Sequence, residues 1–330
     1  MKISIKSLIN PTPSLSVIIF SITIVIWSIV FFFLDANPSH FSDSILSSLL
    51  DNLLQSDLLL NIFVFLICGL NALLILQLNN RFTIIRTRTF MPVIIYLMLV
   101  SVWKDTHVLV SLHFTITLII ASFFVFFDMF RNQEATEQAF LGSFFIGVGS
   151  LFIQPIVLII PVCWLGFIFL QSLSFRTWLA SIIGVLIPWI LYIAVRYFIQ
   201  PDLSWVYSLF GGFELDFTID FSDKVHLIYL ISILAVFSIG LVGLMSNLQG
   251  DSLHTKAKIN FLLLLFILSF IFSLIFKNLY LEFMLIVALT GSILISHPLT
   301  LKPRGIYAIL FYALILVNLS FLITNIYMNN

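Results

Sequence analysis

Long uncharged apolar segments recur along this chain and constrain its fold more than any other feature. Most are close to the roughly 20 residues that an α-helix needs to cross the hydrocarbon core of a bilayer. Eleven such segments occur, at 14–34, 58–78, 90–103, 108–127, 139–154, 155–170, 178–199, 225–245, 261–276, 279–295 and 306–323. Because lipid offers no partner for backbone polar groups, each segment is expected to be helical. The sequence therefore predicts an all-α, polytopic transmembrane helix bundle forming a single domain over residues 1–330.

Composition supports this fold class and excludes several functions. Hydrophobic residues make up 61% of the chain and charged residues 9%, against roughly 45–50% and 25% in soluble proteins. Too little polar surface remains for a water-soluble enzyme, and no basic stripe suggests a nucleic-acid partner. The segments at 90, 139, 155, 261 and 279 are short for a span, so we expect them to thin the bilayer or to rely on neighbours. Pro155 makes 139–170 either two helices or one broken helix, and both interpretations stay open.

The distribution of basic residues predicts the orientation. Cytoplasmic segments carry an excess of Lys and Arg, and an inside N-terminus with eleven crossings places eleven of the fifteen basic residues there. These are Lys2, Lys6, Arg81, Arg86, Arg88, Arg131, Arg176, Lys256, Lys258, Lys302 and Arg304. The outer segments keep only Lys104, Arg196, Lys224 and Lys277. The chain is therefore predicted to run from a cytoplasmic N-terminus to an outer C-terminus.

Two outer segments are long enough to be more than turns. In 35–57, apolar residues recur at helical spacing between 45 and 54, which predicts an interfacial amphipathic helix at 42–56. In 200–224, residues 213–221 alternate apolar and polar, which is typical of a strand, and the glycines at 211 and 212 suggest a hairpin over 205–221. One face of that strand carries Glu214, Asp216 and Asp220. Three such carboxylates can hold a divalent cation or act as acid and base, and an acidic, solvated face is the commoner meaning of the pattern.

An ionisable side chain inside a span is costly unless it is paired or hydrated, so each one is a candidate for function. Arg196, Glu282 and His113 all map to the outer half of the membrane, on the same side as Asp35. We expect Asp35, Arg196 and Glu282 to converge on one cavity open to the outer leaflet. A purely structural arrangement, with Arg196 reaching the interface and Glu282 paired with Lys277, explains the same residues.

Uncharged polar residues within the spans have a simpler interpretation. Asn71, Gln77 and Asn318 are expected to bridge helices by hydrogen bonds. Cys68 and Cys163 are mid-span and are expected to be packing residues.

Some features resemble known proteins. The segments 78–92, 142–155, 175–179 and 184–189 resemble an uncharacterised family of Phe-rich inner-membrane proteins from Bacteroidota, over about the first two thirds of the chain. That resemblance implies a bacterial inner-membrane location and no known activity. The layout is also similar to the GT-C superfamily of membrane glycosyltransferases, which place an acidic residue just after the first helix and an interfacial helix in the following outer loop. Asp35 and 42–56 match this layout, but an adjacent acidic pair and a large outer C-terminal domain are missing.

Two functions follow as hypotheses. In the first, the protein transfers a sugar from a polyprenyl-phosphate carrier at the outer face, with Asp35 as general base or metal ligand and Arg196 neutralising the lipid phosphate. In the second, it is a non-enzymatic subunit of a cell-envelope assembly or secretion complex that pairs with a protein partner through the hairpin at 205–221. A transporter would need an inverted repeat with paired broken helices and also a charge at mid-membrane, and the sequence offers neither clearly.

Overall fold

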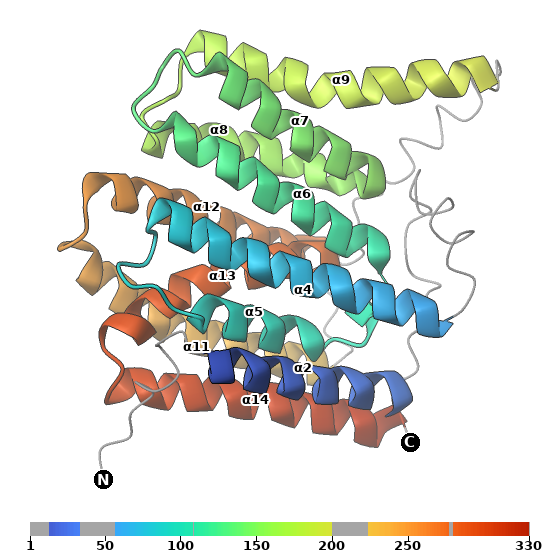
Figure 1. Cartoon of the computed structure of the whole chain (residues 1–330), viewed down its shortest axis with the longest axis vertical. Coiled ribbons are helices and arrows are strands. Elements are labelled where there is room, and N and C mark those ends of the chain that lie inside the picture. Colours follow the sequence, from blue (N-terminus) through green and yellow to red (C-terminus); the bar gives the residue numbers. More distant parts are fainter. Residues whose placement is uncertain (1–12, 34–56, 108, 200–223, 277–279, 330) are drawn as a thin grey trace.

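Eleven α-helices and three short 3-10 turns build the part of the chain that the computed structural model describes, residues 13–33, 57–107, 109–199, 224–276 and 280–329 (Figure 1). The helices are α2 (Pro13–Phe33), α4 (Asp57–Phe82), α5 (Met91–Ser101), α6 (Val110–Phe126), α7 (Thr136–Phe152), α8 (Ile159–Phe169), α9 (Phe175–Ile199), α11 (Lys224–Leu248), α12 (Leu253–Ile275), α13 (Tyr280–Leu301) and α14 (Ile306–Asn329). The turns are η2 (Asp105–His107), η3 (Phe127–Met129) and η4 (Gln154–Leu158). The predicted all-α fold is confirmed.

The helix boundaries answer several sequence predictions. Residues 139–170 form two helices, because α7 ends at Phe152 and α8 begins after the turn η4, which contains Pro155. The short segments at 90 and 155 are confirmed, since α5 and α8 have 11 residues each. The expectation of short helices at 261 and 279 was wrong, because α12 and α13 have 23 and 22 residues. Ser252 caps α12 by accepting a hydrogen bond from Thr255 N at 3.2 Å, which starts this helix ahead of its apolar part.

Seven of the described helices are long and apolar enough to cross a membrane. The helices lie roughly parallel in Figure 1, from α9 at one edge to α14 at the other. Large apolar side chains are exposed along α2, α9, α11 and α14, and a patch of this extent on a soluble protein would drive aggregation. The protein is therefore an integral, multi-pass membrane protein, and the helices at the periphery of the bundle face lipid.

Helix α13 occupies the middle of the bundle, where every residue from Leu281 to Thr300 is buried. At the edge, α9 packs along α7. Gly147 and Gly184 permit this close approach: a β-carbon at Gly184 would overlap the carbonyl oxygen of Phe140. The two glycines thus let the backbones of α7 and α9 pack almost in contact.

The two ends of the bundle differ in charge. The connections α4–α5, α6–α7, α8–α9, α11–α12 and α13–α14 lie at one end, together with the start of α2, and the end of α14 lies at the other (Figure 1). The first end holds every described basic side chain that was predicted to be cytoplasmic. Lys2 and Lys6, which were predicted to be on the same side, lie outside the described residues. We call these ends the inner and outer ends, in keeping with the predicted orientation, which stays a prediction.

Two predicted outer elements fall outside the described residues. These are the interfacial helix at 42–56 and the hairpin at 205–221. Both stay predictions.

Candidate functional site

A cavity with a volume of about 330 Å³ lies between α2, α5 and α14. We call it the α2–α5–α14 cleft. Its lining is almost entirely apolar, with Ile18, Ile22 and Ile26 from α2, Ile94 and Met98 from α5, and Phe311, Ile315 and Leu319 from α14. These three helices are neighbours along the same edge of the bundle in Figure 1. The volume is in the range of sites that take small molecules, about 300–1,000 Å³.

A few polar groups line this cleft. Thr23 donates to the Ile19 carbonyl at 2.8 Å. Asn318 donates to the Leu314 carbonyl at 2.8 Å and accepts from the Tyr229 hydroxyl at 3.0 Å. Ser101 is different, because its hydroxyl is buried and has no hydrogen-bond partner among the described residues.

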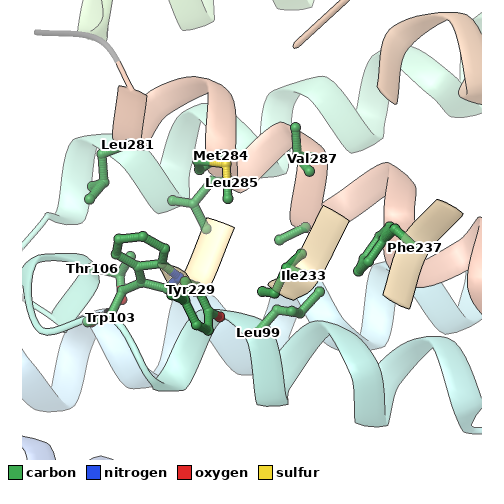
Figure 2. A pocket seen from close by; sticks show the side chains of 11 residues that line it. Leu99, Trp103, Thr106, Tyr229, Ile233, Phe237, Leu281, Met284, Leu285 and Val287 are labelled. Atoms are coloured by element: carbon green, nitrogen blue, oxygen red, sulfur yellow. Dashed lines mark hydrogen bonds between the residues drawn. The ribbon is translucent and has the colours of Figure 1, made fainter. Parts of the chain in front are cut away.

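Asn318 connects the cleft to a second, smaller cavity lined by α5, α11 and α13 (Figure 2). Figure 2 shows Trp103 and Tyr229 close together at one end, with Met284 and Leu285 of α13 across from them. The Trp103 and Tyr229 rings meet edge to face, with centroids 5.2 Å apart. This cavity measures about 20 Å³, room for about one water molecule. It is therefore a packing site rather than a ligand site.

Two buried histidines lie near the outer end of α5 and α6. His107 Nε2 is 3.0 Å from the Ser101 carbonyl, and His113 Nε2 is 2.9 Å from the Thr106 carbonyl. A carbonyl oxygen only accepts, so each Nε2 carries the proton and donates. Burial lowers the pKa of His107 to about 3, against a smaller raising effect of its bond to Ser101. The His107 ring is therefore neutral at physiological pH.

The predicted site residues are only partly described. Asp35, Glu214, Asp216 and Asp220 lie outside the described residues, so their predicted roles stay predictions. No group of three or more His, Cys, Asp or Glu side chains suited to a metal occurs in the described part.

The other three predicted residues lie on separate helices. Arg196 is on α9 at the edge of the bundle and donates to the Tyr192 hydroxyl at 2.9 Å. Glu282 is buried in the first turn of the central helix α13. His113 is on α6, completely buried. Of these helices, α6 and α13 are in contact, whereas α9 packs along α7. The described residues therefore show Arg196 on a helix apart from Glu282 and His113.

Of the three amide side chains expected to bridge helices, Asn71 and Asn318 do so. Asn71 on α4 donates to the His113 carbonyl at 3.0 Å and accepts from the Thr117 hydroxyl at 2.7 Å, so it joins α4 to α6. Asn318 joins α14 to α11 through Tyr229. Gln77 is exposed on α4.

A buried charge cluster at the inner end was missed from the sequence. Arg86 in the α4–α5 loop donates from Nε to Asp251 Oδ1, and His297 Nε2 lies 3.0 Å from Asp251 Oδ2 without the alignment of a hydrogen bond. The side chains of Asp251 and His297 are each only 1% exposed. We call these residues the inner charge cluster. Because α13 was expected to end at residue 295, His297 was not recognised as an ionisable residue inside a span.

Lys258 is a second buried charge at this end. Its Nζ donates to the Phe82 carbonyl at 3.3 Å, at the C-terminus of α4, and lies 4.4 Å from the centre of the Phe82 ring. A cation is favoured at the negative end of a helix dipole and over an aromatic face. Lys258 was expected in a loop, and the structure instead buries it in α12.

Comparison with known proteins identifies a family but no activity. The model of the Family of unknown function (DUF6427) matches residues 14–328. No curated protein and no solved structure matches the chain. Since the family model spans nearly the whole sequence, the chain belongs to the DUF6427 family of unknown function.

Proposed function

We propose that this membrane protein is a transferase that acts on a polyprenyl-phosphate-linked sugar at the outer face of the bacterial inner membrane. In this proposal, the α2–α5–α14 cleft holds the isoprenoid chain. The observation that carries it is the cleft itself, an apolar space of about 330 Å³ between three helices of a membrane-embedded bundle.

The position and lining of the cleft favour a lipid over a water-soluble ligand. The residues Ile18, Ile22 and Leu319 line it and are also among the exposed or partly exposed apolar side chains of their helices. A cleft with such a rim is reached from the hydrocarbon core. Burial of apolar surface against isoleucine, methionine and phenylalanine side chains would hold a hydrocarbon chain without directional contacts.

The proposed catalytic residue follows, in the sequence, one of the helices that line this cleft. Helix α2 ends at Phe33, and Asp35 follows two residues later. A carboxylate there would suit a general base, or a ligand for a divalent cation, that activates an acceptor hydroxyl next to a lipid held by α2.

Filling the cleft tests lipid binding. Ile315→Trp places a larger side chain in the lining, so labelling of α2, α5 and α14 by a photoactivatable polyprenyl phosphate in nanodiscs is expected to fall about tenfold. The matched control is Leu316→Trp, one residue away on the lipid-facing side of α14, where the side chain is 66% exposed. This control should label as the wild type does. Equal labelling of both variants, or labelling confined to other helices, would contradict the proposal.

Replacing Asp35 tests the chemistry separately. Asp35→Asn preserves the shape of the side chain and removes its charge, so lipid-linked sugar transfer is expected to fall roughly 10²- to 10⁴-fold. Photolabelling of the cleft should stay at the wild-type level. Full complementation of a deletion strain by the Asn variant would show that Asp35 is not the catalytic base. The envelope-subunit function would instead be favoured by two results together. The wild type would bind the lipid but transfer no sugar, and loss of the protein would prevent a cell-envelope complex from assembling.

A further inference from the structure

Asp251 lies between two basic side chains in the inner charge cluster. Arg86 Nε donates to Asp251 Oδ1 on one side, and His297 Nε2 lies 3.0 Å from Oδ2 on the other. The three residues come from separate elements, because Arg86 is in the α4–α5 loop, Asp251 is in the α11–α12 connection and His297 is in the central helix α13. The cluster therefore joins the loop before α5 to the helix at the centre of the bundle.

The contact between Asp251 and His297 is incomplete. Asp251 Oδ2 and both ring nitrogens of His297 are buried and have no hydrogen-bond partner among the described residues. A neutral imidazole carries one N–H, whereas a protonated imidazole carries two and a positive charge. A proton on His297 would therefore turn this contact into a charge-assisted hydrogen bond from Nε2 to Oδ2. Asp251 thus has two possible cationic partners, the guanidinium of Arg86 and the protonated ring of His297.

One buried carboxylate cannot neutralise both of these cations. While the ring is neutral, the charges of Arg86 and Asp251 cancel, and a proton on His297 adds a positive charge that nothing compensates. A buried uncompensated charge is costly, so the cluster gains by releasing one of its two cations. The side chain of His297 is only 1% exposed, whereas that of Arg86 is 43% exposed and can reach water. Arg86 is therefore the cation that leaves.

Two charges act on the His297 ring, those of Asp251 and Arg86. The carboxylate favours a proton on the ring, and the guanidinium opposes it. The other acidic, basic and histidine residues on the described elements that pack against α13 lie in the outer halves of their helices, are exposed, or contact groups other than His297. They are Asp57 and Arg81 of α4, His113 of α6, Lys224 and His226 of α11, His254, Lys256 and Lys258 of α12, Glu282 of α13 itself, and Lys302 and Arg304 of the α13–α14 connection.

We infer that a proton on His297 displaces Arg86 from Asp251, which makes the inner charge cluster a pH-sensitive switch of the α4–α5 loop. The loop begins with two buried isoleucines and continues with the exposed residues 86–88, so its tip is the part that is released. The switch lies at the inner end of the bundle, whereas the proposed sugar transfer is at the outer face. The two proposals are therefore independent.

A spin label in the loop tests this switch. Thr87→Cys places a single label next to Arg86, because the two native cysteines, Cys68 and Cys163, are buried. Electron paramagnetic resonance spectra of the labelled protein in nanodiscs are recorded between about pH 8 and about pH 5, the range in which histidine titrates. The mobile component is expected to grow relative to the immobile one as the pH falls, by up to about tenfold per pH unit, which is the limit for a single proton.

Substitutions in the labelled protein identify the groups responsible. His297→Gln removes the proton site and leaves Arg86 bound, so the label should stay immobile at every pH. Arg86→Gln removes the anchor of the loop tip, so the label should be mobile at every pH. His254→Gln and Arg88→Gln are matched controls, a second histidine at the inner end and a second arginine in the loop, and both should respond to pH as the labelled wild type does.

Several outcomes would overturn the switch. A label whose mobility does not change with pH does so, and so does a pH response that persists in His297→Gln or disappears in His254→Gln. If His297→Gln does not fold, Arg86→Gln still decides, because a pH response without Arg86 would show that its release is not what the label reports. None of these results depends on sugar transfer, so failure of the switch leaves the proposed function as it stands.

Discussion

Replacing Arg86 with alanine is expected to lower the free energy of unfolding by about 3 kcal/mol. The physical reason is the asymmetry of the inner charge cluster, in which the side chain of Arg86 is 43% exposed and that of Asp251 only 1%. Removing Arg86 leaves a buried carboxylate whose remaining neighbour is the His297 imidazole, which is neutral unless it takes a proton. Unfolding of the purified protein in a denaturing detergent, followed by circular dichroism, measures the loss.

The partner substitutions sharpen this test. Asp251→Ala should cost less than Arg86→Ala, because the half-exposed guanidinium that remains can reach water. Arg88→Ala is the matched control, since Arg88 is exposed in the same loop, and a change within about 0.5 kcal/mol is expected. Equal effects of Arg86→Ala and Arg88→Ala would show that the buried pair does not stabilise the fold.

Gly184→Ala is expected to destabilise the α7–α9 packing by about 2–3 kcal/mol. The added methyl would overlap the Phe140 carbonyl oxygen, and a backbone atom inside a helix cannot rotate away as a side chain can. Helix α9 must then move away from α7, its main packing partner. Denaturation as above, combined with limited proteolysis of the connection before Phe175, should show earlier release of α9.

Gly240→Ala provides the comparison. A β-carbon there would lie 3.3 Å from Ile295 Cγ1, an atom of a side chain that can adjust. Alanine also has the better helix propensity, by about 1 kcal/mol, so this variant should be neutral or slightly stabilised. A similar loss at both glycines would mean that the close backbone approach at Gly184 is not what matters.

Helix number and type could be predicted because apolar length reports directly on membrane crossing. The division at Pro155 was also visible as a feature, although only the structure distinguishes two helices from one broken helix. The start of α12 was missed because Lys256 and Lys258 were interpreted as loop residues. Hydropathy alone cannot show that Lys258 is compensated by the carbonyl and ring of Phe82, 176 residues away in sequence.

The sites were harder to predict than the helices. The α2–α5–α14 cleft is formed by segments from the beginning, the first third and the end of the chain, and no local pattern marks them as neighbours. Arg86 and Asp251 are 165 residues apart. His107 was not singled out because it lies in a three-residue turn, outside any apolar segment. Such sites depend on tertiary contacts, whereas the predicted roles of Asp35 and the outer carboxylates are statements about residues outside the described ranges.

The burial of α13 bears on how the protein is made. This helix has the lowest mean hydropathy of the seven long spans, and the side chains of Thr290, Ser296 and His297 are among its buried groups. A lone helix with these groups gains less from entering lipid than α4 or α11 does. Its neighbours α5 and α12 are synthesised before it and α14 directly after it. Stable insertion of α13 is therefore an assembly step, in which the earlier helices provide the surface that receives it and α14 completes the bundle.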